Sequence, residues 1–548
     1  MRALLSRLRL LARAATLWVL GCFAVASSAE PAATLTVLRG GTVYTGDDNP
    51  PTVTDVWIQG DRIIAVGDGG GLEADVVIDV AGLAVAPGFI DLHSHAIREN
   101  DQRSGLYSWP DAENLLRQGI TTVIGGPDGW SPLPLEDSFR RIALQGSAVN
   151  YGSFVGHGAV RERVMGMEDR PPTAPELRRM EAEVEQAMRE GAFGLSSGLV
   201  YVPGSFANTE EIVALAKVAA RHGGIYISHM RNEALEVLEA VRELIQVAEA
   251  AGLPAQITHA KTMGTAMQGR SKDLLALVEA ANARGLDITL DVYPYAAGST
   301  SLTVQFPRWS VDGGHRALAE RLKDPEQRSR IHEALIYELT AVRGRNDPAN
   351  VQLAYCDFDH SLDGLNLAEI LALRERAVTI ANAAMLIIEL QEAGGCQAIY
   401  HAMHPDDVIT LLTYPRTMIA TDGGIQSPGE GHPHPRSYGT YPRVLGHYVR
   451  ELRALPLHSA IHKMTGMPAD RIGLNDRGRL VEGAIADIVV FHPDEVIDRS
   501  TFTDPHRQSE GVDHLWVAGE AVMLDKRLTG RRPGRILRSK AHTGSVQP

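Results

Sequence analysis

The chain has 548 residues, of which 44% are hydrophobic, and a formal net charge of −14. This length exceeds one ordinary domain, and the apolar content is sufficient for a large core. The negative charge, with no Lys/Arg-rich block after the N-terminus, argues against nucleic acid as a partner.

Residues 1–29 have the pattern of a secretory signal peptide. Four arginines lie within the first thirteen residues, an apolar run follows at 14–26, and small residues at 27–29 offer a cleavage site. An uncleaved anchor helix is the alternative, although the apolar run is short for a membrane span. No later segment is long and apolar enough to cross a membrane. We therefore expect an exported protein, periplasmic or secreted, with no stable membrane span after signal cleavage.

The cysteines are Cys22, Cys356 and Cys396, and they form no C-x-x-C pattern. A zinc cluster built from thiolates is therefore excluded. Export would place Cys356 and Cys396 in a compartment where disulfides form. Whether the two pair is left open by the sequence.

Residues 33–86 contain short apolar segments that alternate with turns, a pattern typical of a small antiparallel β-module. Residues 470–538 return to short strands of the same kind. We expect these two segments to complete one another as a discontinuous β-sandwich domain built from both ends of the chain.

Between them, residues 87–469 alternate apolar strands with helical stretches, for example at 209–222 and 233–251. Strand–helix alternation with polar residues at the strand ends is typical of a (β/α)8 TIM barrel. An α/β fold with a barrel domain at 87–469 is therefore expected. Residues from 300 to about 355 read as an insertion between barrel strands near the active site.

Metal-type ligands follow several of these strands. His93 and His95 come directly after the apolar segment 86–92, and residues i and i+2 of a strand point to the same face. His229, His259 and Asp422 each end a further strand. Singly, the first pair could be two chance histidines on a surface strand, His229 or His259 a hydrogen-bonded core residue, and Asp422 a turn residue. Because a barrel directs all strand ends to one mouth, together they predict a metal site that suits zinc, with other divalent metals possible.

Longer motifs sharpen this reading. The chain resembles the N-acyl-D-amino-acid deacylases (D-aminoacylases) of the metal-dependent amidohydrolase superfamily from about residue 35 to 538, with the most specific motifs at 191–199, 229–233, 291–299 and 434–446. The resemblance implies hydrolysis of the acyl amide bond of N-acyl-D-amino acids, giving a carboxylate and a free D-amino acid.

The resemblance also implies roles for the ligands, in a centre with one or two zinc ions. His229 and His259 would hold the tightly bound metal, and His93 and His95 a second site. Asp422 would act as the general base and then the general acid. One position departs from the family pattern: Asp128 stands where the family has a metal-binding cysteine. Asp128 could ligate metal as an anionic bridge, or it could belong to a Pro-Asp-Gly turn without metal.

Substrate-binding residues follow from the same resemblance. Arg436 matches the arginine that binds the substrate α-carboxylate, which a guanidinium does with two parallel hydrogen bonds. Lys261, Tyr293, Ser299 and Met403 match positions lining the pocket. The ordinary alternatives are a surface ion pair for Arg436, a solvated side chain for Lys261 and core packing for Met403.

Two other functions compete with this one. A related amidohydrolase could act on D-residue dipeptides or on cyclic amides of the dihydroorotase and hydantoinase type, but the Arg436 motif favours a free carboxylate over a ring. A non-catalytic amidohydrolase-like protein would be expected to have lost ligands, which this chain retains. His157 is expected to be structural, and no oligomeric state is predicted.

Overall fold

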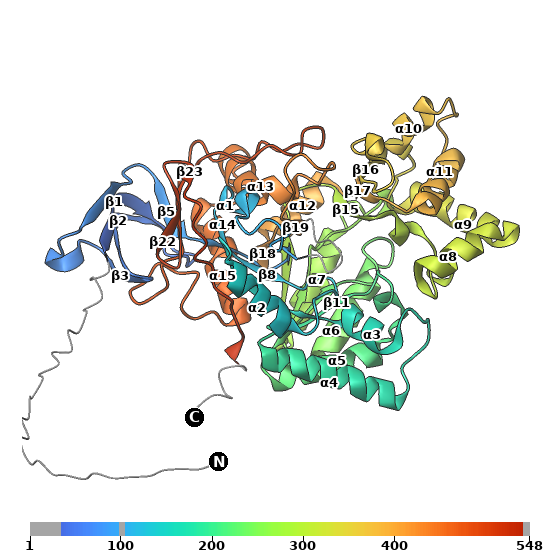
Figure 1. Cartoon of the computed structure of the whole chain (residues 1–548), viewed down its shortest axis with the longest axis horizontal. Helices are drawn as coiled ribbons and strands as arrows, with labels where there is room; N and C mark the ends of the chain where they lie inside the picture. The colour runs from blue at the N-terminus through green and yellow to red at the C-terminus, as the bar shows by residue number, and fades with distance from the viewer. Residues whose placement is uncertain (1–33, 98–104, 541–548) are drawn as a thin grey trace, which may run out of the picture.

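The computed structural model describes residues 34–97 and 105–540 (Figure 1). The expected signal peptide lies outside the described residues. Among the helices of the described ranges, none has the length and apolar character needed to cross a membrane.

Both ends of the described chain contribute to one nine-stranded sheet. Its strands are β1 (Leu35–Val43), β2 (Thr52–Gln59), β3 (Arg62–Val66), β4 (Val76–Asp79), β5 (Ala84–Pro87), β20 (Ile488–Phe491), β21 (Val512–Val517), β22 (Glu520–Leu524) and β23 (Arg527–Leu528). The order is β23-β22-β21-β20-β5-β1-β2-β3, with β4 paired to β1. The antiparallel pairing of β20 with β5 joins the two chain ends, as expected from the separate patterns at 33–86 and 470–538.

Parallel strands fill the middle of the molecule. One sheet contains β6 (Phe89–Asp91), β8 (Ile120–Gly125) and β9 (Asn150–Ser153), and a second contains β10 (Val155–Gly156), β11 (Gly194–Gly198), β12 (Ile225–His229), β13 (Ala255–Ile257), β14 (Ile288–Val292) and β18 (Thr417–Ile419). The short strands β7 (Ser94–His95) and β19 (Gly423–Gly424) pair in parallel with each other. These strands are buried along their length, as expected when helices cover a parallel sheet.

Helices connect and flank these strands. They are α1 (Glu113–Leu116), α2 (Leu135–Gln145), α3 (His157–Met165), α4 (Ala174–Glu190), α5 (Thr209–Arg221), α6 (Val237–Ala251), α7 (Ser271–Ala283), α12 (Pro405–Thr413), α13 (Arg436–Arg443), α14 (Leu457–Met464) and α15 (Gly466–Ile472). Figure 1 shows α4, α5 and α6 side by side along one side of the parallel strands.

One expected helix start agrees with the structure, at Thr209, and a second differs. The helix expected from residue 209 is capped by Asn208, whose side chain accepts a hydrogen bond from the backbone of Glu211 at 2.9 Å. The helix expected from residue 233 begins only at Val237. The side chain of Asn232 accepts hydrogen bonds from the backbone of Ala234 and Glu236 at 2.8 and 3.2 Å, which holds this segment in a turn.

A separate layer lies between β14 and β18 in the sequence. It contains β15 (Gly298–Ser301), β16 (Val351–Tyr355) and β17 (Gln397–Tyr400) as an antiparallel sheet, with α8 (Gly314–Lys323), α9 (Pro325–Tyr337), α10 (Leu367–Leu373) and α11 (Ile380–Ala393). The segment expected to be an insertion, at about 300–355, falls within it. In Figure 1 this layer lies at the opposite end of the molecule from the nine-stranded sheet. A disulfide joins Cys356 and Cys396 inside it, which answers the question of pairing that the sequence left open.

Candidate metal centre and substrate pocket

The expected ligands meet at the carboxyl ends of the parallel strands. His93 follows β6 and His95 ends β7, while His229 ends β12 and His259 follows β13. Asp422 lies between β18 and β19, and its backbone N–H donates to the carbonyl of His93 at 2.9 Å. The ends of the first and the last parallel strands are therefore held against each other.

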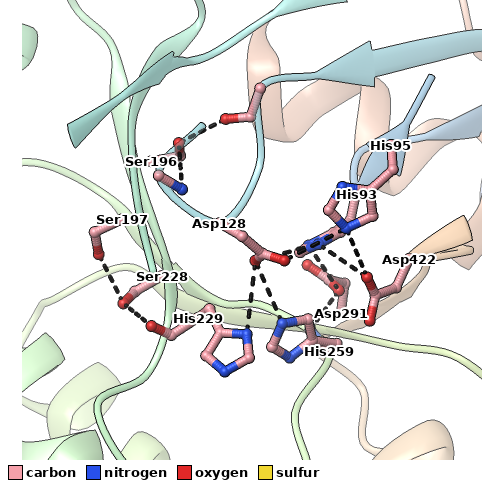
Figure 2. Close-up of polar contacts among 12 residues, drawn as sticks. His93, His95, Asp128, Ser196, Ser197, Ser228, His229, His259, Asp291 and Asp422 are labelled. Atoms are coloured by element: carbon pink, nitrogen blue, oxygen red, sulfur yellow. Dashed lines mark hydrogen bonds and ion pairs between the residues drawn. The ribbon is translucent and has the colours of Figure 1, made fainter. Parts of the chain in front are cut away.

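Asp128 lies at the centre of this cluster (Figure 2). Its Oδ1 atom is 3.4 Å from Nε2 of His93, 3.3 Å from Nε2 of His259 and 3.8 Å from Nδ1 of His229. Its Oδ2 atom is 3.4 Å from Nε2 of His95. Two overlapping donor groups result: His93, His95, Asp128 and Asp422 form one, and Asp128, His229 and His259 form the other.

The separations suit metal coordination. Zinc–nitrogen and zinc–oxygen bonds of about 2.0–2.2 Å in a tetrahedral site place neighbouring ligand atoms about 3.3–3.6 Å apart. Both ring nitrogens of His93 and Oδ1 of Asp128 are buried and have no hydrogen-bond partner among the described residues. Buried polar atoms without a partner are rare, and a shared cation would satisfy both residues. The donor set therefore fits a divalent metal at each group.

Asp128 and His229 are the two donors of the cluster that already have the protonation state a metal needs; burial would lower the pKa of His93, but Asp128 and Asp422 raise it well above its usual value. Burial would raise the pKa of the Asp128 carboxyl, but His93 and His259 outweigh that effect and hold the pKa well below its usual range. Burial lowers the pKa of His229 to about 3, so this imidazole is neutral at physiological pH. An ionised carboxylate and a neutral imidazole are the forms that bind metal.

Three of the ligand-type residues have unusual backbone conformations. Asp128, His259 and Asp422 have φ angles of 54°, 36° and 49°. Residues other than glycine seldom adopt positive φ, and such strain gathers at functional sites where the surroundings enforce it. In each case the residue comes just after a buried strand, so the turn aims the side chain back into the cluster.

Further carboxylates hold the ligands in place. Asp91 accepts hydrogen bonds from the backbone of His93 at 3.2 Å and of Thr421 at 3.0 Å. Asp291 accepts one from the backbone of His259 at 2.7 Å. Both carboxylates are fully buried, so they fix the turns that carry the ligands.

Glu233 supports the cluster from another side. Its carboxylate is 3.0 Å from Nδ1 of His259, 3.4 Å from Nε2 of His229 and 2.7 Å from Nζ of Lys261. Orientation of metal-binding imidazoles by a carboxylate is common in metal sites. The sequence reading assigned no role to Glu233, Asp91 or Asp291. The available signal was that Glu233 follows His229 by four residues and Asp91 precedes His93 by two.

Arg436 begins α13 and lies against Asp422. Its Nη1 donates to Oδ2 of Asp422 at 2.6 Å and its Nη2 donates to the carbonyl of Ser299 at 3.2 Å. The guanidinium also lies 4.9 Å above the ring centre of Tyr293. Burial would raise the pKa of Asp422, but Arg436 and two histidines of the cluster hold it well below its usual range. Arg436 is therefore buried rather than part of a surface ion pair.

Arg436, Asp422 and Asp128 line a cavity of about 660 Å³, and Lys261, Tyr293 and Ser299 line it as well. Lys261 is buried, and its Nζ lies 5.6 Å from the ring centre of Tyr293. Met403 differs from the other expected pocket residues. It lies beside Lys261 and Tyr293 in a small adjoining cavity and is not among the residues that line the large one.

His157 lies away from the cluster. It begins α3 and its Nε2 is 2.8 Å from Oε1 of Glu211, which also binds the guanidinium of the fully buried Arg161. This buried ion network, which lies outside both metal-donor groups, is consistent with the structural role expected for His157.

Ser196 and Ser197 lie on β11 at the edge of the cluster (Figure 2). Ser196 Oγ donates to the carbonyl of Gly126 at 2.5 Å and accepts from the backbone of Gly129 at 3.2 Å. It therefore joins both ends of the turn that carries Asp128. Ser197 instead contacts hydroxyl groups within the strands.

Helix-flanked parallel strands with metal donors at their carboxyl ends define a class of α/β metalloprotein. The family follows from comparison with known proteins. A family model described as the amidohydrolase family matches residues 76–337 and 371–523. The D-aminoacylase of Alcaligenes xylosoxydans xylosoxydans is 36% identical over 524 residues, which are 91% of this chain and 97% of that protein. The N-acyl-D-glutamate deacylase of the same organism is 36% identical over 528 residues, 92% of this chain and 96% of that protein.

The chain therefore belongs to the amidohydrolase family, and the resemblance to the N-acyl-D-amino-acid deacylases is confirmed. A solved structure of a D-aminoacylase with a binuclear metal centre is 35% identical, covers 93% of this chain and 100% of its own, and has a TM-score of 0.78. That of the N-acyl-D-glutamate deacylase from Bordetella bronchiseptica, complexed with zinc and a phosphonate inhibitor, is 31% identical with the same TM-score, covering 92% and 100%. The expectation of an amidohydrolase enzyme is confirmed.

Proposed function

We propose that this protein hydrolyses the acyl amide bond of N-acyl-D-amino acids to a carboxylate and a free D-amino acid. The observation that carries the proposal is the contact between Arg436 and Asp422, at 2.6 Å, in the cavity whose lining includes members of both donor groups. A cation that can hold a substrate carboxylate thus lies beside a carboxylate that can accept a proton.

The metal is proposed to be zinc, in one or two ions. His229 and His259 would hold one ion and His93 and His95 the other. Asp128 would serve both, because its Oδ1 faces His259 and His93 and its Oδ2 faces His95. Four imidazoles with carboxylates are donors that zinc favours. When bound, such an ion lowers the pKa of water and polarises a carbonyl group.

Asp422 is proposed to take a proton from the attacking water and to deliver it to the departing amine. A general base must lie within hydrogen-bond reach of the group it serves, and Asp422 faces the cavity beside His95, at 3.1 Å. Asp422 itself is buried, with 5% of the residue exposed, and that exposed part faces the cavity.

Arg436, Lys261, Tyr293 and Ser299 would bind and orient the amino-acid part of the substrate. An incoming α-carboxylate would compete with Asp422 for the guanidinium of Arg436. Binding of substrate would thus weaken the ion pair that keeps Asp422 a poor base. Met403 would act by packing under Lys261 and Tyr293 rather than by direct contact.

Cyclic amides are the weaker alternative. A dihydroorotase of Lactobacillus gasseri is 25% identical over 285 residues, which are 47% of this chain. Buried Arg436 favours a linear substrate that ends in a free carboxylate. D-residue dipeptides also end in a carboxylate, so they remain an alternative that the assay below separates.

The experiment measures metal content by mass spectrometry together with hydrolysis of N-acetyl-D-methionine, N-acetyl-L-methionine, a D-residue dipeptide and a hydantoin. We expect bound zinc and turnover of N-acetyl-D-methionine alone, abolished in Asp422→Asn. Turnover of only the L-form, the dipeptide or the ring would refute the substrate assignment, and metal-loaded protein without any turnover would refute the enzyme assignment.

We also propose that the parallel strands close into the expected (β/α)8 barrel, formed by residues 87–469 with its insertion, and that 33–86 with 470–538 form a separate β-sandwich domain. Closure is supported by the continuity of β9 into β10 through Phe154 and by the pairing of β7 with β19. Hydrogen–deuterium exchange followed by mass spectrometry tests the boundaries, because 33–86 and 470–538 should open as one cooperative unit and 87–469 as another; exchange as a single unit would refute the division.

Export through the signal peptide at 1–29 is a further proposal. The Cys356–Cys396 disulfide supports it, since such bonds persist in oxidising compartments. N-terminal sequencing of the mature protein from a periplasmic extract should begin near Glu30, and a chain that retains residue 1 in the cytoplasmic fraction would refute export.

A further inference from the structure

Arg343 is a second buried arginine of the substrate cavity that the proposed chemistry leaves unused. It directly follows the π-helical segment Glu338–Val342 in the layer between β14 and β18. Its side chain is among those that line the 660 Å³ cavity, together with Lys261 and Arg436. Only 8% of the residue is exposed, so its charge is not a feature of the outer surface.

The guanidinium of Arg343 is only partly occupied. Its Nη1 donates to Oε2 of Glu338 at 2.7 Å. Within residues 34–97 and 105–540, Nε and Nη2 make no hydrogen bond, and neither is among the fully buried atoms that lack a partner. The edge of the guanidinium group formed by Nε and Nη2 therefore remains accessible. Two parallel N–H groups of a guanidinium match the two oxygens of a carboxylate.

The cavity that contains Arg343 also has apolar lining residues. Met263, Val304 and Tyr400 line the same cavity. The phenol of Tyr400 is directed elsewhere, since it donates to the carbonyl of Ser301 at 3.2 Å. The cavity that contains Arg343 thus also offers apolar contacts.

Glu338 forms an ion pair with Arg343 and offsets part of its charge, but the acidic groups that line the cavity do not. Glu233 forms an ion pair with Lys261 at 2.7 Å. Glu338 contacts Nη1 of Arg343 and leaves Nε and Nη2 without a hydrogen bond among the described residues. Asp357 and Glu430 also line the cavity but are exposed to solvent, where charges are screened. Burial would lower the pKa of Arg343, but Glu338 raises it above its usual value, so the guanidinium stays charged.

We propose that Arg343 recognises a second carboxylate of the substrate, in addition to the α-carboxylate assigned to Arg436. The preferred substrates are then N-acyl-D-amino acids that carry an acid in the side chain or in the acyl group. This inference rests on the proposed function, and it names the substrate class within it.

The test uses pairs of substrates that differ by one charge. N-acetyl-D-glutamate is compared with N-acetyl-D-glutamine, and N-succinyl-D-glutamine with its succinamoyl analogue, so the two pairs separate a side-chain acid from an acyl-chain acid. In the metal-loaded wild-type enzyme, kcat/KM for the acid should exceed that for the amide by about 10- to 100-fold in at least one pair, the range for a hydrogen bond to a charged group.

Arg343→Gln should lower kcat/KM for the acid far more than for the amide, which brings that ratio close to one. Arg345→Gln is the matched control, because Arg345 is two residues away and is not among the cavity-lining residues; its ratio should remain that of the wild type. Circular dichroism and thermal unfolding establish that both variants fold.

A ratio near one in wild type for both pairs, or a ratio unchanged in Arg343→Gln, would overturn the inference. If no N-acyl-D-amino acid is hydrolysed, the proposed function fails instead. In that case calorimetric binding of the same four compounds to the metal-loaded protein and to Arg343→Gln decides the role of Arg343.

Discussion

Replacing Arg436 by methionine tests the assignment of the α-carboxylate site. Methionine keeps the unbranched stem but removes the charge and every N–H donor. In the structure two of these donors are used, one by Asp422 at 2.6 Å and one by the carbonyl of Ser299 at 3.2 Å. The remaining donors are those available to a substrate.

The size of the effect follows from the bonds lost. A carboxylate held by two parallel N–H groups loses two hydrogen bonds to charged groups, each contributing about 1.5–3 kcal/mol. A loss of roughly 3–6 kcal/mol corresponds to about a 10²- to 10⁴-fold decrease in kcat/KM. The change also frees Asp422 from its ion pair, so turnover of one substrate alone would not separate the two roles of Arg436.

The assay therefore compares N-acetyl-D-methionine with N-acetyl-D-methioninamide, which lacks the carboxylate. Arg436→Met should reduce kcat/KM for the acid by the full factor and for the amide far less, because the effect on Asp422 is common to both. Arg436→Lys should give an intermediate loss, since lysine keeps the positive charge but lacks the two parallel N–H groups of a guanidinium. An equal loss for both substrates would refute carboxylate binding by Arg436.

The control is Arg443→Met. Arg443 lies on the same helix and stacks 4.9 Å above Tyr295, as Arg436 does above Tyr293, but it pairs with Asp498. It is not among the cavity-lining residues. This variant should change both substrates by the same factor.

Three other changes have defined outcomes. Asp128→Asn should lower the number of metal ions per chain in mass spectrometry, because one carboxylate serves both donor groups; an unchanged stoichiometry would mean that Asp128 forms only a turn. Ser196→Ala should weaken metal affinity roughly 10- to 100-fold, as loss of a supporting hydrogen bond does, whereas Ser197→Ala should bind as the wild type; equal affinities for the two variants would argue against a role for Ser196. Replacing Cys356 and Cys396 by alanine should destabilise the fold by about 4 kcal/mol, the chain-entropy value for a loop of roughly 40 residues, measured by urea unfolding; an unchanged midpoint would contradict the entropic contribution.

Much of the metal centre could be predicted because it obeys local rules. The pair His93 and His95 follows from the two-residue period of a strand. His229, His259 and Asp422 could be grouped because parallel strands direct their carboxyl ends to one edge. Neither inference requires knowledge of how far apart two segments lie in space, so the sequence alone was sufficient to predict these ligands.

The supporting shell could not be predicted in this way. Glu233 reaches His259 and Lys261 only because residues 232–236 form a turn rather than the first turn of α6. Arg343 reaches the cavity from a helical layer that the sequence places 50 residues beyond Tyr293, and no local pattern sets that distance. Met403 was assigned to the pocket, but the structure places it under the pocket wall.

The backbone of the centre is held in place without the metal. The strained turns at His259 and Asp422 are offset by buried acceptors, with Asp291 bonded to the backbone of His259 and Asp91 to that of Thr421. Proteins whose metal site is absent from the unfolded chain and is the main source of stability unfold when metal is removed. Here the turns are fixed by hydrogen bonds, so chelation should abolish hydrolysis while the far-ultraviolet circular dichroism stays unchanged.

On chelation the melting temperature should fall only by the amount expected when a protein loses a ligand that binds the folded state alone. Activity should return when zinc is added. Cooperative unfolding on chelation at room temperature would refute the view that Asp91 and Asp291 organise the site before the metal binds. It would mean that the repulsion and desolvation of Asp128 and Asp422, both buried, exceed what these hydrogen bonds supply.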